Sequence, residues 1–121
     1  MRKTFTYIKS EAISIENMSV YCKFYFKDDD ADFNVTEIKV GITLSGLVEL
    51  GVYNPNQSKD LNDQVRNLLM NIMFNALSGY IEMEQKFPPQ DWLISKPKMI
   101  DISSERNEQA LKGKYKISVY I

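Results

Sequence analysis

Three aspartates at alternate positions are the first residues in this chain whose type and spacing could bind a ligand. Asp28, Asp30 and Asp32 match the first three ligand positions of a calcium-binding loop, in which oxygen atoms surround the ion. The match then fails, because Phe33 occupies the position that requires glycine and Lys39 the position that requires a bidentate glutamate. We therefore predict a solvated hairpin turn and no metal site. Recognition of a basic partner is the alternative use of this cluster.

Catalytic chemistry finds little support in the residue types. The sequence contains no histidine, which removes the commonest general base, the Ser-His and Cys-His nucleophile systems and the usual zinc ligands. The glycines at positions 41, 46 and 51 fall in expected strands and fit no nucleotide-binding loop. Carboxylates remain, but the candidates are turn or surface residues without apolar surroundings that would raise a pKa. We predict that the protein is not an enzyme and needs no cofactor.

A basic and aromatic sheet face is the best alternative to a protein-binding role. Tyrosines and lysines share one face of two expected strands, 19–27 and 114–121: Tyr21, Lys23, Tyr25 and Lys27 on the first, and Lys114, Lys116 and Tyr120 on the second. If these strands pair, such a surface could stack bases and neutralise phosphates of single-stranded nucleic acid. Glu37 and Glu49 on the intervening strands, and a sequence pI of about 5.5, count against this interpretation.

Composition and the single cysteine limit the classes to which the protein can belong. A chain of 121 residues, 44% hydrophobic and 26% charged, is expected to form one globular domain. Its net charge of −1 provides no global field that would attract nucleic acid or an anionic membrane. Cys22 cannot form an internal disulfide, which is typical of a reducing compartment, and its place on the apolar face of a strand predicts a buried, inert thiol. With no signal-peptide pattern at the start, we expect a soluble cytoplasmic protein.

Hydrophobic alternation predicts that the first half of the chain is a meander. Strands are expected over 3–9, 12–16, 19–27 and 38–44. Residues 45–47 then form a hairpin or a bulge, and 48–52 continue as a strand. Because such short connections do not permit parallel pairing, we predict an antiparallel sheet. Further strand segments are expected at 92–94, 99–102 and 114–121, and 103–111 is read as a polar loop or a short helix.

The most informative stretch runs from Asn67 to Ile81, fifteen residues with helical spacing and no charged side chain. A surface helix of a small domain normally carries Lys or Glu on its outer face. This helix instead has a stripe of neutral polar residues, which is either solvated or bonded to loop backbone: Gln64, Asn67, Asn71, Asn75 and Ser78. Ser58 is the expected N-cap. The helix either ends at Gly79 or runs on toward Lys86, and Phe87-Pro88-Pro89 must stop it.

The apolar side chains of this helix cover roughly 240° of its circumference, more than one sheet face can cover. Either the chain wraps the remaining side itself, or Met70, Phe74 and Leu77 contact another protein, most commonly in a homodimer. Trp92 follows the proline-braced loop and is either a buried anchor or an exposed binding residue. The sequence therefore predicts a protein partner, with these four residues as contacts.

The elements together predict an α+β fold: an antiparallel sheet of about five strands, made of the N-terminal meander and the C-terminal strand, with one long helix packed across it. The order of meander, long helix and Phe87-Pro88-Pro89 stop resembles that of SecB-type export chaperones, although the terminal strand 114–121 departs from that pattern. The resemblance implies a chaperone-like peptide binder as one alternative function.

The leading hypothesis from the sequence is a small non-enzymatic binder or inhibitor. Its size, its missing catalytic residues and its apolar helix are typical of an immunity, antitoxin-like or phage-type accessory protein that acts by steric occlusion. We expect it to be a homo-oligomer. A chaperone-like peptide binder and a sheet-face binder of single-stranded nucleic acid are the alternatives.

Overall fold

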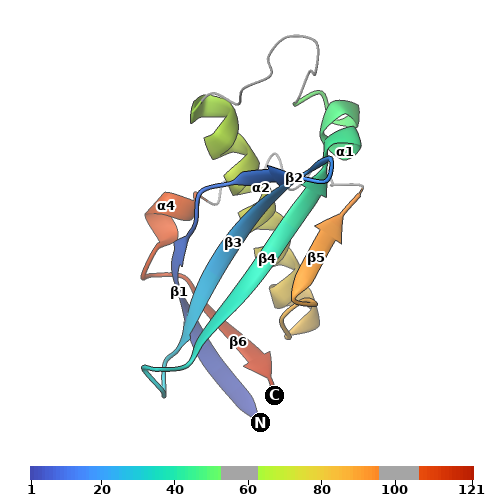
Figure 1. Cartoon of the computed structure of the whole chain (residues 1–121). Coiled ribbons are helices and arrows are strands. Elements are labelled where there is room, and N and C mark those ends of the chain that lie inside the picture. Colours follow the sequence, from blue (N-terminus) through green and yellow to red (C-terminus); the bar gives the residue numbers. More distant parts are fainter. Residues whose placement is uncertain (53–62, 96–106) are drawn as a thin grey trace.

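A curled mixed sheet with a long helix across one face forms the framework of the protein (Figure 1). The structure is a computed structural model that describes residues 1–52, 63–95 and 107–121. The α+β class expected from the sequence is confirmed. In chain order the elements are β1 (Arg2–Ser10), β2 (Ser14–Glu16), β3 (Ser19–Asp28), β4 (Val35–Thr43), α1 (Leu44–Glu49), α2 (Asp63–Glu84), β5 (Asp91–Ile94), α4 (Glu108–Leu111) and β6 (Lys116–Tyr120).

The strand order is β5-β4-β3-β1-β6, and β2 pairs with the beginning of β3. All of these pairings are antiparallel except that of β5, which lies parallel to β4 with Val40 opposite Trp92. The prediction of a purely antiparallel sheet is therefore wrong at this edge. The physical reason is the long connection between β4 and β5, which includes α2 and so permits a parallel crossover.

Residues 44–52 form a short helix and its cap, not the hairpin or bulge and the strand that we predicted. The helix begins where the Thr43 hydroxyl accepts a hydrogen bond from the N–H of Gly46 (3.1 Å). It ends where Gly51 takes a φ of +75°. There the N–H of Gly51 bonds to Val48 O and that of Val52 to Leu47 O, the paired bonds of a Schellman motif. Gly51 is thus a helix-terminating residue and does not belong to a strand.

α2 continues through Gly79 and ends at Glu84, so the longer of the two predicted helices is the one observed. Gln85 closes it with a φ of +56°, and its N–H bonds to Ile81 O (2.7 Å). The predicted cap Ser58, the strand segment 99–102 and the first four residues of the segment 103–111 lie outside the described residues. The end of that last segment is helix α4.

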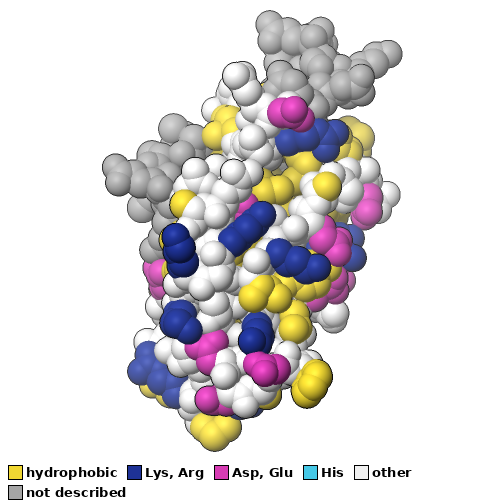
Figure 2. All heavy atoms as spheres, turned by 90° about the vertical axis from the view of Figure 1, so that its left-hand side faces the viewer, with side chains coloured by type: hydrophobic (Ala, Val, Ile, Leu, Met, Phe, Trp, Pro, Cys, Tyr) yellow, Lys and Arg dark blue, Asp and Glu magenta, His cyan; other side chains and the backbone are white. Residues whose placement is uncertain are grey.

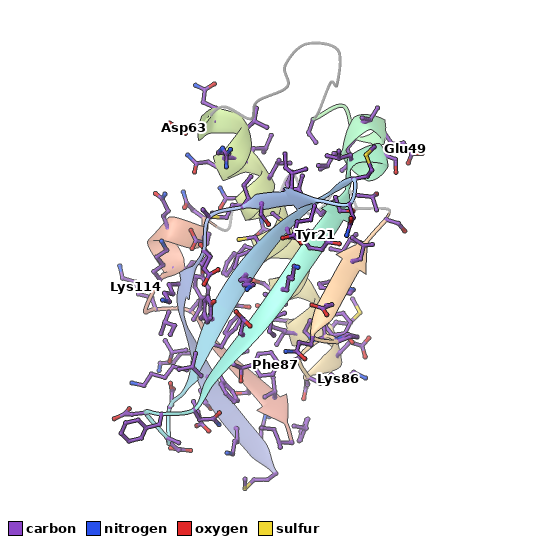
Figure 3. The ribbon with its side chains drawn as sticks, in the orientation of Figure 1. Tyr21, Glu49, Asp63, Lys86, Phe87 and Lys114 are labelled. Atoms are coloured by element: carbon purple, nitrogen blue, oxygen red, sulfur yellow. The ribbon has the colours of Figure 1, made fainter. Side chains whose placement is uncertain are left out.

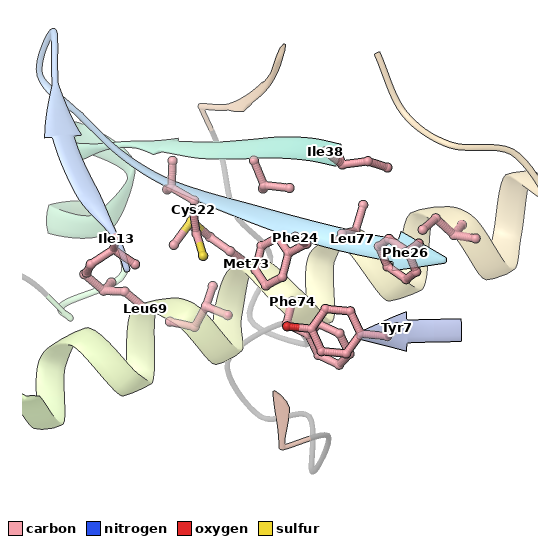
Figure 4. Packing of buried hydrophobic residues seen from close by; sticks show 14 of the residues in the cluster. Tyr7, Ile13, Cys22, Phe24, Phe26, Ile38, Leu69, Met73, Phe74 and Leu77 are labelled. Atoms are coloured by element: carbon pink, nitrogen blue, oxygen red, sulfur yellow. The ribbon is translucent and has the colours of Figure 1, made fainter. Parts of the chain in front are cut away.

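The core lies between α2 and the inner face of the sheet (Figure 4). As expected from the alternation in β3, Cys22, Phe24 and Phe26 are buried. Phe74 is at the centre: its ring centroid lies 4.9 Å from that of Tyr7, 5.9 Å from that of Phe24 and 5.6 Å from that of Tyr115. Every residue of α2 from 72 to 78 is buried. This helix is therefore enclosed within its own chain.

The aspartate cluster forms the β3–β4 turn, as predicted. The Asp28 side chain is fully buried and accepts hydrogen bonds from the backbone N–H of Asp30 (2.9 Å) and the Asn34 amide (3.1 Å), besides its ion pair with Lys3 (3.1 Å). The bond from Asp30, more than any other contact, lowers the pKa of Asp28. The Asp28 carboxylate thus stabilises the turn, because its oxygens accept hydrogen bonds from donors in the surrounding loop.

Gly41 gives the ring of Tyr21 room to lie against β4 on the open face of the sheet. A Cβ at this position would lie 2.4 Å from Tyr21 Cε1 and 3.1 Å from Leu93 Cδ1. The Lys39 ammonium is 4.4 Å from the centroid of the same ring. The Tyr21 ring therefore fits against Gly41, which has no side chain to obstruct it, and is held by a cation–π contact with Lys39.

We expect Gly41→Ala to lower the free energy of unfolding by about 1–3 kcal/mol, because the new methyl group forces the Tyr21 ring away from its site. Urea denaturation measures this effect. Gly79→Ala is the matched control: a Cβ there meets no other atom within 4 Å, and alanine is favoured over glycine in a helix by about 0.5–1 kcal/mol. A loss of stability for Gly41→Ala that persists unchanged in a Tyr21→Ala background would contradict this explanation.

Phe74→Ala should lower the free energy of unfolding by about 3–5 kcal/mol, because it removes a fully buried ring from the centre of the core. Met83→Ala on the same helix removes a side chain that is 75% exposed, and should change stability by no more than about 0.5 kcal/mol. Denaturation of both variants tests whether Phe74 is a core residue. Similar stabilities for the two would show that it is not.

Candidate functional site

A buried carboxylate is the most unusual polar group among the described residues. Glu108 begins the short helix α4, and only 1% of its surface is exposed. Its Oε1 atom accepts hydrogen bonds from the hydroxyls of Tyr7 and Ser10, the latter at 2.9 Å, and the Lys112 ammonium lies 3.6 Å away. Its Oε2 atom is also buried and has no hydrogen-bond partner within the described ranges. Such an atom carries a desolvation cost until a donor reaches it.

An irregularity in β1 brings the two hydroxyls together. The pairing of β1 with β3 places Tyr7 opposite Phe26, skips Ile8, and resumes with Lys9 opposite Tyr25, so that Ser10 lies opposite Phe24. Positions 7 and 10 would face opposite sides of a regular strand, because side chains alternate. The extra residue shifts the alternation by one, so both side chains reach the inner face and the same carboxylate oxygen.

The backbone of α4 is fixed by two asparagines. The Asn107 side chain caps this helix by accepting from the N–H of Gln109 (3.0 Å). Asn71 of α2 accepts from the N–H of Glu108 (3.0 Å). One member of the neutral stripe on α2 thus binds backbone, as one of the two alternatives from the sequence had it, but the backbone belongs to the first residue of α4 and not to a loop.

A pocket of about 90 Å³ lies beside this carboxylate, between α2 and α4. We name it the Glu108 pocket. Apart from the thioether of Met70 and the carboxylate itself, its walls consist of side-chain amides; the lining residues are Asn67, Met70, Asn71, Asn107, Glu108 and Gln109. Its volume is enough to hold several water molecules. The site is therefore small, polar and acidic.

The surroundings of Glu108 favour the protonated forms of the nearby Tyr7 hydroxyl and Cys22 thiol. Burial raises the pKa of Tyr7 above its ordinary value, and the hydrogen bond to Glu108 is the second largest cause. Burial also raises the pKa of the Cys22 thiol to about 12, with a smaller contribution from the charge of Glu108. Tyr7 and Ser10 accordingly act as neutral donors to the carboxylate. The arrangement is an anchored, buried carboxylate whose second oxygen has no hydrogen bond within the described ranges.

The sequence did not identify this site. Glu108 was expected to lie in a polar loop or short helix, and carboxylates in general to lack apolar surroundings; burial of Glu108 and of Asp28 shows that expectation to be wrong for these two. An asparagine directly before a glutamate is a helix N-cap signal. Nothing in the alternation of β1 indicated the shift at Ile8 that brings Tyr7 and Ser10 together.

The four predicted partner contacts occupy different environments. Phe74 and Leu77 are fully buried in the core of this chain and present no surface to a partner. Met70 is half-buried and borders the Glu108 pocket, where its sulfur lies 3.4 Å from the Ser10 hydroxyl. Trp92 is half-buried in β5, and its ring packs on Tyr80 of α2 with centroids 5.0 Å apart.

The basic and aromatic face is divided by β1. β3 and β6 do not pair with each other; both pair with β1, so Lys27 and Lys116 lie on either side of Thr6. Figure 3 shows Lys114 near α4, away from Tyr21 on the sheet. Glu49 is on α1 and not on an intervening strand.

Most lysines of this face have acidic partners. Ion pairs join Lys23 to Glu37 (3.5 Å), Lys27 to Asp32 (2.9 Å), Lys39 to Glu16 (3.2 Å) and Lys116 to Asp29 (2.8 Å). The Tyr25 hydroxyl donates to Glu11 and Glu37, and Arg2 lies over the Tyr120 ring. On the side shown in Figure 2, blue and magenta side chains are interspersed. A phosphate backbone would have to displace these carboxylates.

Other kinds of site are not formed by the residues described. Across 1–52, 63–95 and 107–121, no three acidic, cysteine or histidine side chains gather closely enough to hold a metal ion. Among the helices of those ranges, none combines the length and apolar character needed to cross a membrane.

Comparison with known proteins gives no family. No family model matches the chain, and no curated protein or solved structure gives a match.

Raised pKa values predict that the folded protein loses stability in alkali. Above pH 10 unfolded chains release the Tyr7 proton while the folded state retains it. The free energy of unfolding therefore falls as pH rises, by up to about 1.4 kcal/mol per pH unit from this residue. Tyr7→Phe should make the slope between pH 10 and 11.5 shallower by that amount in urea denaturation. Equal slopes for the two proteins would contradict the burial of a neutral tyrosine.

Proposed function

We propose that this chain is a non-enzymatic binding module that contacts a protein partner through the side formed by α2 and α4. The supporting observation is the Glu108 pocket, an opening between α2 and α4 that polar residues line and to which Met70 offers an adaptable apolar wall. A concave opening with a few polar groups beside an apolar side chain is a natural binding feature.

A catalytic role receives less support from the same residues. The Ser10 hydroxyl donates to the Glu108 carboxylate, but the same carboxylate oxygen also accepts from Tyr7. Tyr7 has a raised pKa and keeps its proton. A nucleophile or general base needs the opposite arrangement, with a proton acceptor poised near neutral pH. We therefore keep the proposal that the protein acts by binding alone.

The biological class remains the one argued from the sequence. We propose a small cytoplasmic binder or inhibitor, such as an immunity, antitoxin-like or phage-type accessory protein. A buried Cys22 thiol with a raised pKa is compatible with a reducing compartment. Occlusion of a partner's surface requires only a stable, shaped face, which a small α+β protein can provide.

The homo-oligomer expected from the sequence was argued from an apolar helix side that needed a second cover. Phe74 and Leu77 of that side are buried within this chain. Of the three helix residues in that argument, only Met70 borders an opening. We therefore propose that the partner is a different protein. Light scattering of the purified chain measures its oligomeric state directly.

A photo-crosslinking amino acid at Gln109, which is exposed at the pocket, should give a defined partner adduct in the source cell, whereas the same group at Val35 on β4 should not. Met70→Glu should reduce this adduct at least tenfold, because it places a second negative charge beside Glu108. Met83→Glu, on the same helix but outside the pocket, should leave it unchanged.

Equal adducts from Gln109 and Val35 would overturn the proposal. Adducts with many unfolded chains would instead support the chaperone-like alternative. Adducts lost on nuclease treatment would support the nucleic-acid alternative. Circular dichroism of the two methionine variants verifies that both retain the fold.

A further inference from the structure

The short helix α4 is held in place by few of its own residues. Glu108 is its only buried residue, whereas Gln109 and Ala110 are exposed and Leu111 is half-buried. Four residues cannot stabilise a helix by themselves, because forming the first turn fixes several dihedral angles for one hydrogen bond. The position of α4 beside β1 and α2 (Figure 1) therefore depends on contacts with those elements.

Four hydrogen bonds among the described residues attach this segment to its neighbours. The Glu108 carboxylate accepts from Tyr7 and Ser10 of β1, and the Glu108 N–H donates to Asn71 of α2. The N–H of Gly113 donates to Tyr7 O (2.7 Å). Three of the four bonds are made by Glu108, so α4 loses most of its attachment to both neighbouring elements when this one residue leaves its site.

The docked position of Glu108 also has an unfavourable side. Its Oε2 atom is buried without a hydrogen bond within the described ranges, and the ammonium of Lys112, whose side chain is 43% exposed, lies 3.6 Å from the other oxygen. A buried carboxylate that is only partly compensated carries a desolvation cost, which hydration removes. Release of α4 places both oxygens in water, so the docked and released positions differ less in free energy than the four bonds alone imply.

The chain that follows α4 combines a hinge with a fixed anchor. Gly113 has a φ of +74°, and a Cβ at this position would meet no atom within 4 Å. Shortly after it, β6 pairs with β1, from Lys116 opposite Thr6 to Tyr120 opposite Arg2. Because glycine can absorb a large change of backbone dihedral angles, α4 can move while β6 stays in the sheet.

We propose that α4 is a latch, which undocks from β1 and α2 as one unit while the sheet and α2 stay folded. Since α4 forms one wall of the Glu108 pocket, undocking opens this pocket. It also exposes to solvent the Ser10 hydroxyl and the Met70 sulfur, which lie 3.4 Å apart beside it. The latch thus controls access to this side of α2. The inference goes beyond the proposed function, because it holds whether or not a partner binds there.

Native-state hydrogen exchange of the intact protein, followed by nuclear magnetic resonance, tests the latch. The reporters are the backbone N–H groups of Glu108, Leu111 and Gly113, each of which donates a hydrogen bond when α4 is docked. The reference is β3, which lies between β1 and β4 in the sheet. We expect the three reporters to share one opening constant, at least about 100-fold larger than that of the slowest β3 amides, because local opening needs less free energy than global unfolding.

Two substitutions give opposite expectations for the reporters. Ile38→Val weakens the sheet core, which stays folded when the latch opens, so it should speed exchange of the slowest β3 amides about threefold to tenfold and leave the reporters unchanged. Ser10→Ala removes a bond that opening breaks, so it should raise the opening constant of all three reporters about threefold to tenfold. Ser14→Ala on β2, an exposed serine, is the matched control and should leave the reporters unchanged.

Reporters that exchange no faster than β3, or that speed up together with β3 in Ile38→Val, would overturn the proposal, because α4 would then leave only when the whole protein unfolds. Unequal opening constants at Glu108 and Gly113 would show fraying of single residues and no latch. Equal effects of Ser10→Ala and Ser14→Ala would show that the Glu108 carboxylate does not hold α4. The wild-type protein and Ile38→Val keep the test decisive even if Ser10→Ala fails to fold.

Discussion

The enclosure of α2 is the constraint on which the rest of the structure depends. Seven consecutive residues, 72–78, are buried, and at about 100° per residue seven positions face every direction around a helix. A charged side chain anywhere in this stretch would have to be buried with a counter-ion, at a cost of several kcal/mol for each ion. The absence of charge from 72 to 78 is therefore a requirement of the fold. It follows that an uncharged helix in a small domain can mark a core as well as an interface.

Enclosure also explains why polar groups lie deep in this protein. A helix covered on all sides brings the segments that cover it into the interior, together with their polar side chains and backbone. Glu108 at the start of α4 is buried in this way, and its backbone N–H bonds to Asn71 of α2. The shift at Ile8 of β1 then turns both Tyr7 and Ser10 toward the same carboxylate. The network holds β1, α2 and α4 together, and its Tyr7–Glu108 bond is buried.

The sequence predicted those elements whose hydrophobic periodicity is long enough to read. It did not predict which strands pair over long distances, or where one extra residue changes the side to which side chains point. β3 alternates from Val20 to Lys27 with one apolar face, so its strand and buried side were readable. α1 spans six residues, too few to separate a period of 3.6 from one of 2, and only Gly51 as a helix-terminating glycine signalled it. The parallel pairing of β5 depends on a partner that precedes it by about fifty positions. The Glu108 site depends on one skipped residue in β1, which reverses the facing of all that follows.

The same constraint links the core to the pocket. Because α2 carries no lysine or arginine from Asn67 to Ile81, the helix that borders Glu108 can offer its carboxylate only amides and a thioether. Compensation from within the described residues comes from two hydroxyls and the half-exposed Lys112, all directed to one oxygen. The second oxygen has no donor among the described residues. Because the helix supplies no charge beside Glu108, burial of the carboxylate is compensated by neighbouring hydroxyls and by the ammonium of Lys112.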